Sequence, residues 1–209
     1  SQVVSSYSPA SSGSVDITEP VFGPSETDVV AVSSGNPPYL QAWAWSNDTQ
    51  WGSKRTNSAN LNTATSANGG ENTKFSPFGN AVFATVGGSN GTPWVFAFAY
   101  TEGTGFGTKF ANVSSSSLTS MRSMNIAGSS ATAQKVLCCG FSATPIIINF
   151  SSATGFGTKL TSPSGMPICT NSSGTAKSFQ LGSGGTDVAY ASSANGTVVY
   201  TYTNASGFG

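Results

Sequence analysis

The stretch Trp94-Val95-Phe96-Ala97-Phe98-Ala99-Tyr100-Thr101 decides the fold class of this chain. Aromatic side chains stand at every second position from Phe96 to Tyr100, with alanine between them. A period of two residues is that of a β-strand, whose successive side chains point to opposite faces of a sheet. The stretch therefore predicts a strand with one bulky face and one small face, which suits sheets that pack face to face.

Similar stretches return along the chain. Residues 39–46 align with residues 94–101 without gaps, and shorter copies stand at residues 146–151 and 198–203. An apolar run precedes each copy across a turn rich in Gly, Asn, Pro or Ser, and these runs are residues 28–32, 80–84, 135–139 and 187–191. We interpret each pair of runs as a β-hairpin. An apolar anchor lies further upstream of each hairpin, at Phe22, Phe75, Ile126 and Phe179.

A glycine motif follows each hairpin. Its copies are Gly105-Phe106-Gly107-Thr108-Lys109, Gly155-Phe156-Gly157-Thr158-Lys159, the degenerate Gln50-Trp51-Gly52-Ser53-Lys54, and Gly207-Phe208-Gly209. Its aromatic residues are 55, 50 and 52 positions apart. A period near 50 residues is typical of propeller blades. Glycine recurring beside an aromatic residue favours a turn with positive φ whose aromatic ring fills a gap between blades. A phosphate-binding loop is disfavoured because the Walker spacing and a following helix are missing.

Each repeat thus holds about four short strands and no helical period. The sequence predicts an all-β fold, a β-propeller or a propeller-like arc of about four antiparallel repeats of roughly 50 residues. We expect a single domain over residues 1–209, with repeats near 7–54, 55–109, 110–159 and 160–209. Residues 1–20 are candidates to complete the last blade, which would place Tyr7 near Phe208 and remove two open edges. An open arc, or an oligomer that completes the ring, is the alternative.

Two further details concern the edges of the blades. Residues 109–113 are expected to form a short outer strand after the glycine motif. The lysines of the motif, Lys54, Lys109 and Lys159, are expected to lie at blade edges, where positive charge discourages unwanted strand pairing.

The ionisable residues exclude several classes of function. The chain holds eight Lys and Arg, eight Asp and Glu, and no His, so its formal net charge is zero and only 8% of its residues are charged. No basic field attracts nucleic acid, and the absence of His removes the usual general base and the commonest transition-metal ligand. We expect no enzyme, no cofactor and no metal site.

The acidic residues give no catalytic pair. They are Asp16, Glu19, Glu26, Asp28, Asp48, Glu71, Glu102 and Asp187. Asp28 and Asp187 stand just before equivalent strands, where the second copy has Asn80. We interpret them as turn residues that bond their own backbone, and calcium binding through repeated Asp and Asn is the alternative.

Two other groups of residues have a structural and a functional interpretation. Cys138, Cys139 and Cys169 are expected to be free, buried thiols rather than zinc ligands. Trp43, Trp45, Trp94 and Tyr100 are expected to pack in the core, and sugar binding by these rings is the alternative. No apolar run reaches the roughly 20 residues of a membrane helix, so no membrane insertion is expected.

The turn Phe75-Ser76-Pro77-Phe78-Gly79 before one hairpin, combined with the glycine motif after it, resembles the propeller-type, WD-repeat-like segments of tailed-bacteriophage structural proteins. The resemblance implies a virion location, as a capsid decoration protein, a head fibre or a tail-associated protein. It implies contacts with other virion proteins or with a host-surface glycan, and no catalytic residues. A glycan-binding lectin propeller is the first alternative, and a secreted propeller enzyme is a weaker one.

Overall fold

The structure, a computed structural model, describes residues 17–33, 40–48, 50–55, 70–86, 95–113, 121–140, 145–160, 179–181, 187–192, 196–203 and 207–208. Within these residues it contains sixteen strands and no helix. The strands form four antiparallel sheets, each made of four strands that are consecutive in the chain. No described segment is a helix that could cross a membrane.

We call the four sheets blades and number them in chain order. The first blade holds β1 (Ile17–Phe22), β2 (Asp28–Ser33), β3 (Leu40–Ser46) and β4 (Gln50–Lys54). The second holds β5 (Gly70–Phe75), β6 (Ala81–Val86), β7 (Val95–Thr101) and β8 (Gly105–Lys109). The third holds β9 (Met121–Ser130), β10 (Ala133–Gly140), β11 (Ile146–Ser151) and β12 (Gly155–Leu160). The fourth holds β13 (Phe179–Leu181), β14 (Asp187–Ser192), β15 (Gly196–Thr203) and β16 (Gly207–Phe208).

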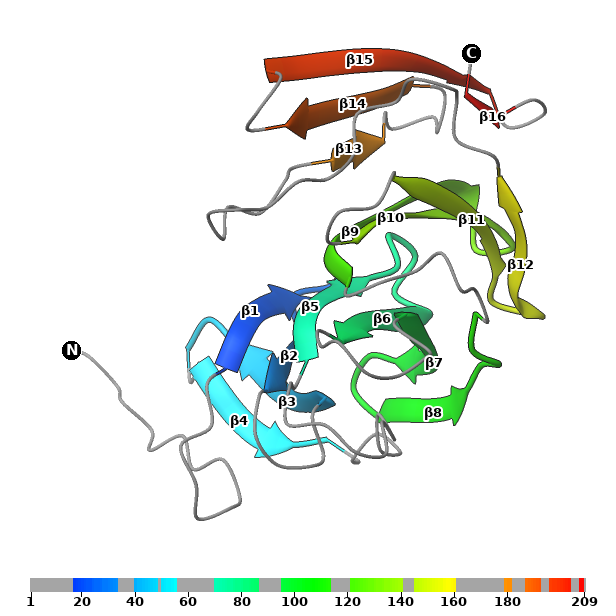
Figure 1. Cartoon of the computed structure of the whole chain (residues 1–209). Coiled ribbons are helices and arrows are strands. Elements are labelled where there is room, and N and C mark those ends of the chain that lie inside the picture. Colours follow the sequence, from blue (N-terminus) through cyan, green and yellow to red (C-terminus); the bar gives the residue numbers. More distant parts are fainter. Residues whose placement is uncertain are drawn as a thin grey trace.

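The blades follow one another in an arc (Figure 1). Their first strands lie side by side, with β1 next to β5, β5 next to β9, and β9 next to β13. The fold is therefore the predicted all-β, propeller-like arc of four antiparallel blades. Residues 17–20, proposed above to help complete the last blade, instead belong to β1 of the first blade. Residues 1–16, and with them Tyr7, lie outside the described residues.

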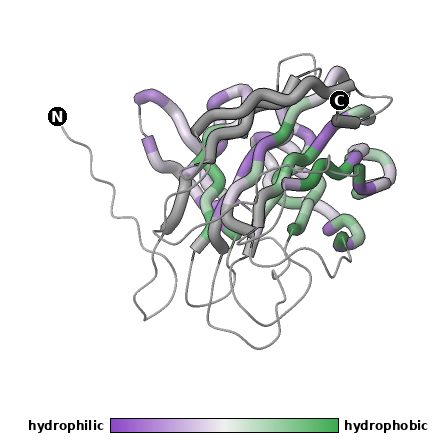
Figure 2. The backbone as a smooth tube through the Cα atoms, turned by 45° about the horizontal axis from the view of Figure 1, so that its top comes forward, coloured by the Kyte–Doolittle hydropathy of each residue, from purple (hydrophilic) through white to green (hydrophobic). Residues whose placement is uncertain are grey.

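The bulky face of one blade packs on the small face of the blade before it, as the alternation in the sequence predicts. Phe96, Phe98 and Tyr100 of the second blade form one core cluster with Val30 and Ala42 of the first. The opposite face of the second blade belongs to the other cluster, whose members from the second and third blades are Ala81, Phe83, Val95, Ala97, Met124, Val136, Cys138, Ile146, Ile148 and Phe150. Figure 2 shows the hydrophobic segments gathered in the middle strands and the hydrophilic ones at the turns.

The strand register corrects two equivalences expected from the sequence. Asp28 pairs with Ala44, and Ala81 pairs with Ala99, so Ala81 rather than Asn80 takes the place of Asp28 in the second blade. The turn before β6 is one residue longer than the sequence alignment assumes. In the fourth blade the backbone pairs Leu181 with Val188, so Leu181 rather than Phe179 takes the anchor position.

The glycine motif is a strand rather than a turn. Gly105–Lys109 and Gly155–Leu160 are the outermost strands of their blades, whereas residues 110–113, expected to be an outer strand, are not in a strand. The first glycine of each copy has positive φ, 117° at Gly105 and 83° at Gly155, and Gln50 adopts 58° at the same position. The positive φ ends the tight turn after the preceding strand and lets the motif fold back along it.

Candidate functional site

Asp28 lies at the junction between the first and second blades and is fully buried. Its Oδ1 accepts hydrogen bonds from Arg55 Nε at 2.9 Å and Arg55 Nη2 at 2.7 Å. Its Oδ2 accepts from the hydroxyl of Tyr100 at 2.8 Å and from the backbone N–H of Gly103 at 2.9 Å. Both oxygens are thus satisfied, and Tyr100 and Gly103 belong to the neighbouring blade.

The role of Asp28 differs from the expected one, a turn residue bonding its own backbone. Tyr100 and Gly103 are more than 70 positions away in the chain. The difference follows from burial: a carboxylate at 0% exposure needs a cation and several donors in place of water, and these come from two blades. Gly103 has a φ of 82°, a left-handed conformation that glycine adopts without strain, and its N–H donates to the carboxylate from that turn.

The burial of this cluster also affects Tyr100. Desolvation, then the hydrogen bond to Asp28 and the charge of that carboxylate, raise the pKa of Tyr100 well above its usual value. Its hydroxyl is therefore a hydrogen-bond donor at neutral pH and not a general base. The cluster of Asp28, Arg55, Tyr100 and Gly103 has the character of a structural clamp between blades.

A second clamp lies on the turns beside it. Glu102, after β7, accepts hydrogen bonds from the backbone N–H and the hydroxyl of Ser25 and from the hydroxyl of Thr27, at 3.2 to 3.3 Å. A Cβ atom at Gly23 would lie 2.6 Å from Glu102 Oε2, and one at Gly79 would lie 2.8 Å from Oε1. Glycine at both positions therefore lets the carboxylate sit between the turns of two blades.

Among the described side chains, the polar contacts at the junction between the second and third blades come from neutral groups. The hydroxyl of Ser76, which is fully buried, donates to Gln134 Oε1 at 2.8 Å, and Gln134 Nε2 donates to the carbonyl oxygen of Ala131 at 2.7 Å. In the second blade, Ala81 has the register position that Asp28 has in the first, and its side chain brings no charge to the interface. Each of these two junctions has its own polar connection, and the repeats differ in its chemistry.

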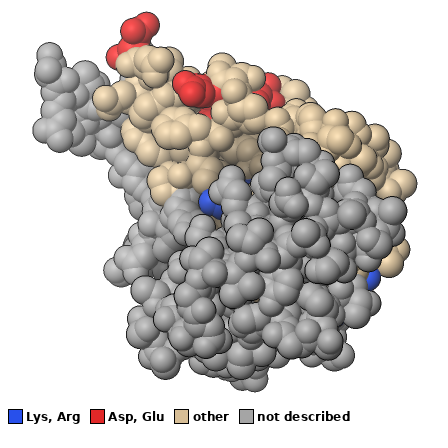
Figure 3. All heavy atoms as spheres, turned by 90° about the horizontal axis from the view of Figure 1, so that it is seen from above, with Lys and Arg blue, Asp and Glu red and all other residues tan. Residues whose placement is uncertain are grey.

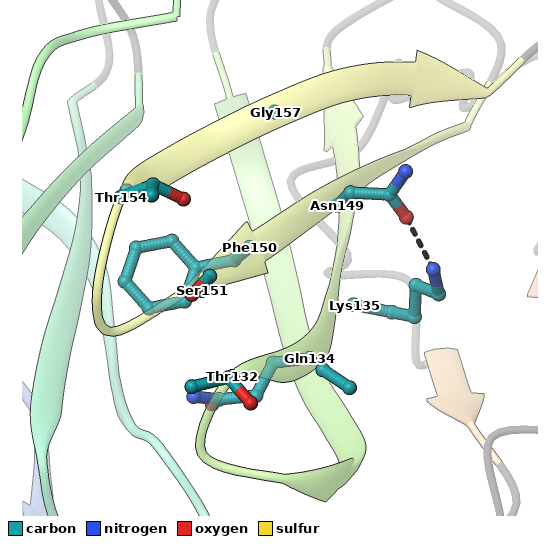
Figure 4. Close-up of a pocket in the computed structure, with 10 residues that line it drawn as sticks. Thr132, Gln134, Lys135, Asn149, Phe150, Ser151, Thr154 and Gly157 are labelled. Carbon is teal, nitrogen blue, oxygen red and sulfur yellow. Dashed lines mark hydrogen bonds between the residues drawn. The ribbon is translucent and has the colours of Figure 1, made fainter.

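The third blade carries a pocket of about 270 Å³, at the end of the sheet where two turns meet (Figure 4). One turn joins β9 to β10 and the other joins β11 to β12, and the N–H of Ser152 donates to the carbonyl oxygen of Ala131 between them. The lining residues are Thr132, Ala133, Gln134, Lys135, Asn149, Phe150, Ser151, Thr154, Gly155 and Gly157.

The polar groups that line this pocket are hydroxyl, amide and amine groups. Lys135 takes the register position of Asp28, and its Nζ donates to Asn149 Oδ1 on the adjacent strand. Burial lowers the pKa of Lys135. The ring of Phe150 points to the other face of the sheet, where it packs against Phe83 with centroids 4.7 Å apart. Phe150 is 2% exposed, so its ring face is not open for stacking on a ligand.

The glycine motif supplies packing rather than a ligand cradle. Phe106 packs against Tyr100 with centroids 5.1 Å apart, and Phe156 packs against Phe150 at 5.3 Å. In the first blade, Gly52 allows the outer strand to approach its neighbour, because a Cβ there would lie 2.9 Å from that of Ala44. Gly207 and Phe208 form β16, and Gly209 lies outside the described residues.

The motif lysines lie at the ends of the edge strands, and one of them touches a ring. Lys54 and Lys109 end β4 and β8, and Lys159 is near the end of β12. The amine of Lys109 sits 4.6 Å from the centre of the Phe96 ring, a cation–π distance. Burial lowers the pKa of Lys54 and Lys109.

Two of the four aromatic residues weighed for sugar binding are in the core. Trp43 is 8% exposed and Tyr100 is 3% exposed, whereas Trp45 is half-buried. Trp94 lies outside the described residues. Two buried rings of this set therefore offer no face to a sugar.

Cys138 is a free thiol and is fully buried, and burial raises its pKa to about 12. Cys169 and the side chain of Cys139 lie outside what the structure describes. Among the described residues, no group of three or more His, Cys, Asp and Glu side chains is placed to hold a metal ion. The side chain of Asp187 is outside the described part, so the calcium alternative stays untested there.

Sequence reasoning missed two of the residues that join the first blade to the second. Arg55, one of two arginines in the chain, directly follows the glycine motif of the first blade. Glu102 directly follows β7 of the second blade. An arginine in a chain with so few charges is itself a signal that a carboxylate needs a partner. Nothing in the sequence indicates that the partner is Asp28, because the contact depends on how strand register brings residue 55 beside residue 28.

Comparison with known proteins identifies the fold. No protein-family model and no curated protein sequence matches this chain. Among solved structures, it is similar to the periplasmic gluconolactonase PpgL of Pseudomonas aeruginosa, with a TM-score of 0.63 and 14% identity over 93% of this chain and 52% of that one. It is also similar to the WD40 domain of SCAP from fission yeast, with a TM-score of 0.52 and 11% identity over 91% of this chain and 40% of that one.

Both similar proteins support a propeller-type repeat fold, and the chain spans about half or less of their length. The expectation that the chain is not an enzyme is corrected by this comparison, because one similar structure is a gluconolactonase and the fold therefore accommodates catalysis. At 14% identity the likeness shows the fold alone and transfers no activity to this chain.

Proposed function

We propose that this chain is a structural protein of a tailed-bacteriophage virion, in the capsid decoration, in a head fibre or at the tail, and that it acts by contact with another virion protein or with the host surface. The proposal rests on the resemblance of Phe75-Ser76-Pro77-Phe78-Gly79 and of the glycine motif to repeats of such proteins. The propeller-like arc is consistent with it, because rigid blades present their turns as a fixed contact surface.

One structural observation supports this function above others: the ions at the junction of the first two blades are used to hold the blades together. Asp28 binds Arg55 and Tyr100, and Glu102 binds the turn at Ser25. Ionic groups that bind one another inside the protein suit a structural role, in which the blades must keep fixed positions. Figure 3 shows acidic side chains at separate points of the described part of one face.

The virion proposal is tested on the particle that carries the protein. An antibody raised against the full chain should label purified particles of the encoding phage in electron microscopy. Mass spectrometry of the same particles should find the chain in a fixed ratio to the major capsid protein. Particles that lack the chain, while the infected lysate contains it, would overturn the proposal. The position of the label separates head from tail.

A glycan-binding propeller is the second candidate, and the pocket of the third blade is the observation that favours it. Its volume of about 270 Å³ and its lining of Lys135, Asn149, Thr132 and Thr154 suit a sugar residue held by hydrogen bonds. The amine of Lys135, which lies beside Asn149, would favour a sugar that carries a carboxylate.

A glycan array followed by calorimetry tests the second candidate. We expect saturable binding that Lys135→Met weakens by about tenfold or more, which corresponds to at least about 1.4 kcal/mol. Lys159→Met is the matched control, because Lys159 is an exposed lysine of the same blade. Equal binding by both variants, or none by the unaltered chain, would exclude the pocket as a glycan site.

A further inference from the structure

The pocket of the third blade lies where this blade departs from the first two. Asn149 takes the register position of Ala44 in the first blade and of Ala99 in the second. It pairs directly with Lys135 on the neighbouring strand, so two polar side chains stand together at this place. The ring of Phe150 lies on the opposite face of the sheet, in the core. The polar pair therefore lines the pocket and does not enter the core.

The hydrogen bonds within the pocket leave it mainly donors to offer to a ligand. The amine of Lys135 donates to Asn149 Oδ1, which occupies the acceptor of the amide and leaves N–H groups on both side chains. Ser151 Oγ accepts from the backbone N–H of Ala153 at 3.1 Å, and its hydroxyl proton remains a donor. The described residues that line the pocket include no Asp or Glu, so none of them brings a carboxylate to the amine. A ligand that fits this set accepts hydrogen bonds and carries a negative charge.

The donors lie toward two ends of the pocket (Figure 4). Lys135 and Asn149 are side by side on adjacent strands, where the two oxygens of one carboxylate can accept from both. Ser151 and Thr154 lie near the turn between β11 and β12, toward the other end. A carboxylate at one end and hydroxyl groups further along is the arrangement found in an acidic sugar, whose ring hydroxyls can be held by hydrogen bonds.

Gly157 leaves room in this pocket for a sugar ring. In the first blade, a Cβ at the equivalent Gly52 would lie 2.9 Å from that of Ala44, so the approach of the strands requires glycine. At Gly157 the nearest atom to a Cβ, the Cβ of Asn149, would lie 3.6 Å away, an ordinary contact, and φ is not positive. Neither packing nor backbone conformation requires glycine here. Because Gly157 is exposed and lines the pocket, the absence of a side chain lets a ligand approach β12.

We propose that this pocket binds the carboxylate of an acidic sugar, either a uronic acid or a sialic acid of a surface polysaccharide. Lys135 and Asn149 hold the carboxylate, and the ring lies over Gly157. The inference rests on the glycan-binding candidate above and deepens it, because it restricts the ligand to charged sugars and assigns Gly157 as the residue that admits the ring. A neutral sugar takes water from the amine of Lys135 without supplying a negative charge, so it binds less well.

Calorimetry of the full chain with two acidic sugars and their neutral counterparts tests the ligand class. The acidic probes are a trisaccharide of galacturonic acid and sialyllactose, and the neutral ones are the methyl ester of that trisaccharide and lactose. We expect saturable binding of an acidic probe, and the acid that binds more tightly identifies the source of the carboxylate. The neutral counterpart of that acid lacks the charge, so its dissociation constant should be at least about tenfold higher.

Two variants test the assigned residues. Asn149→Asp keeps the size of the side chain and places a carboxylate beside Lys135, so it should weaken binding of the acidic probe by at least about tenfold. Gly157→Val fills the space over β12 and should weaken binding by a similar factor, and valine suits a strand. Thr158→Val is the matched control, because Thr158 is exposed on the same strand and its side chain points to the other face. That variant should bind like the unaltered chain.

The outcomes separate this inference from the glycan-binding candidate. Circular dichroism equal to that of the unaltered chain shows that a variant has folded. A folded Gly157→Val protein that binds as tightly as the Thr158→Val protein would overturn the role of Gly157. Neutral probes that bind as tightly as the acidic ones, with no effect of Asn149→Asp, would overturn the restriction to charged sugars and leave the glycan-binding candidate in place. The absence of saturable binding to any glycan would overturn both.

Discussion

Replacing Asp28 by alanine should lower the free energy of unfolding by about 3–5 kcal/mol, the usual cost of removing one partner of a buried ion pair. The change leaves the Arg55 guanidinium without its carboxylate. It also leaves the buried hydroxyl of Tyr100 without an acceptor and removes the acceptor of the Gly103 N–H. Three groups from two blades lose their partner at once, so the effect exceeds that of a surface salt bridge.

Chemical denaturation followed by circular dichroism measures this change. Asp48→Ala is the control, because Asp48 is an exposed carboxylate of the same blade and its loss should change stability by less than about 0.5 kcal/mol. Tyr100→Phe removes one donor and keeps the ring, so it should cost less than Asp28→Ala, about 1–2 kcal/mol. An Asp28→Ala protein as stable as the Asp48→Ala protein would show that the cluster does not hold the blades together.

Most of the fold could be predicted from the repeat pattern, because the sequence has two periods, one of two residues and one of about 50 residues. Alternation at Phe96, Phe98 and Tyr100 identifies a strand and also assigns bulky and small sides, and these are the sides that pack in the structure. Recurrence near 50 residues identifies a blade. The first signal is local, because a strand and its turn are determined mainly by local sequence, and the second is read from repetition along the chain.

The glycine motif shows where local reasoning fails. Its glycines suggested a turn, yet Gly107 lies within β8. At the equivalent position of the first blade, a Cβ on Gly52 would lie 2.9 Å from that of Ala44, so that glycine serves the close approach of two strands rather than a bend. A glycine that bends the chain and one that lets strands approach look alike in a sequence.

The ion pair of Asp28 and the hydrogen bonds that Asp28 accepts across the blade junction could not be predicted either, for a different reason. Asp28 and Arg55 are 27 residues apart, and Asp28 and Tyr100 are 72 apart. Which residues meet depends on strand register and on the rotation between blades, and a shift of one residue would turn Asp28 to the other face. The one-residue difference at Asn80 shows that sequence alignment alone does not fix the register at this level.

Replacing Phe83 by alanine should lower the free energy of unfolding by about 3–5 kcal/mol, the range for truncating a fully buried phenylalanine. Phe83 is 0% exposed in the core between the second and third blades. Its ring packs edge to face against Phe150 at 4.7 Å and against Phe156 at 6.1 Å. Alanine removes both ring contacts and leaves a cavity at a place where two sheets meet.

The place where protection against hydrogen exchange is lost distinguishes a defect at this interface from a general loss of stability. In an arc of repeats, each blade is stabilised by its neighbours, so a defect between two blades is felt first by those two. Hydrogen exchange of Phe83→Ala should therefore speed up most in β6, β7, β10 and β11, with β2 and β3 less affected.

Two further variants complete the test of the core. Phe83→Leu, which keeps most of the volume, should cost less than Phe83→Ala. Phe78→Ala is the exposed control, and it should change stability by less than about 0.5 kcal/mol. Equal loss of protection in all blades would mean that the arc unfolds as one cooperative unit, and a loss as small as that of Phe78→Ala would mean that Phe83 does not hold the second and third blades together.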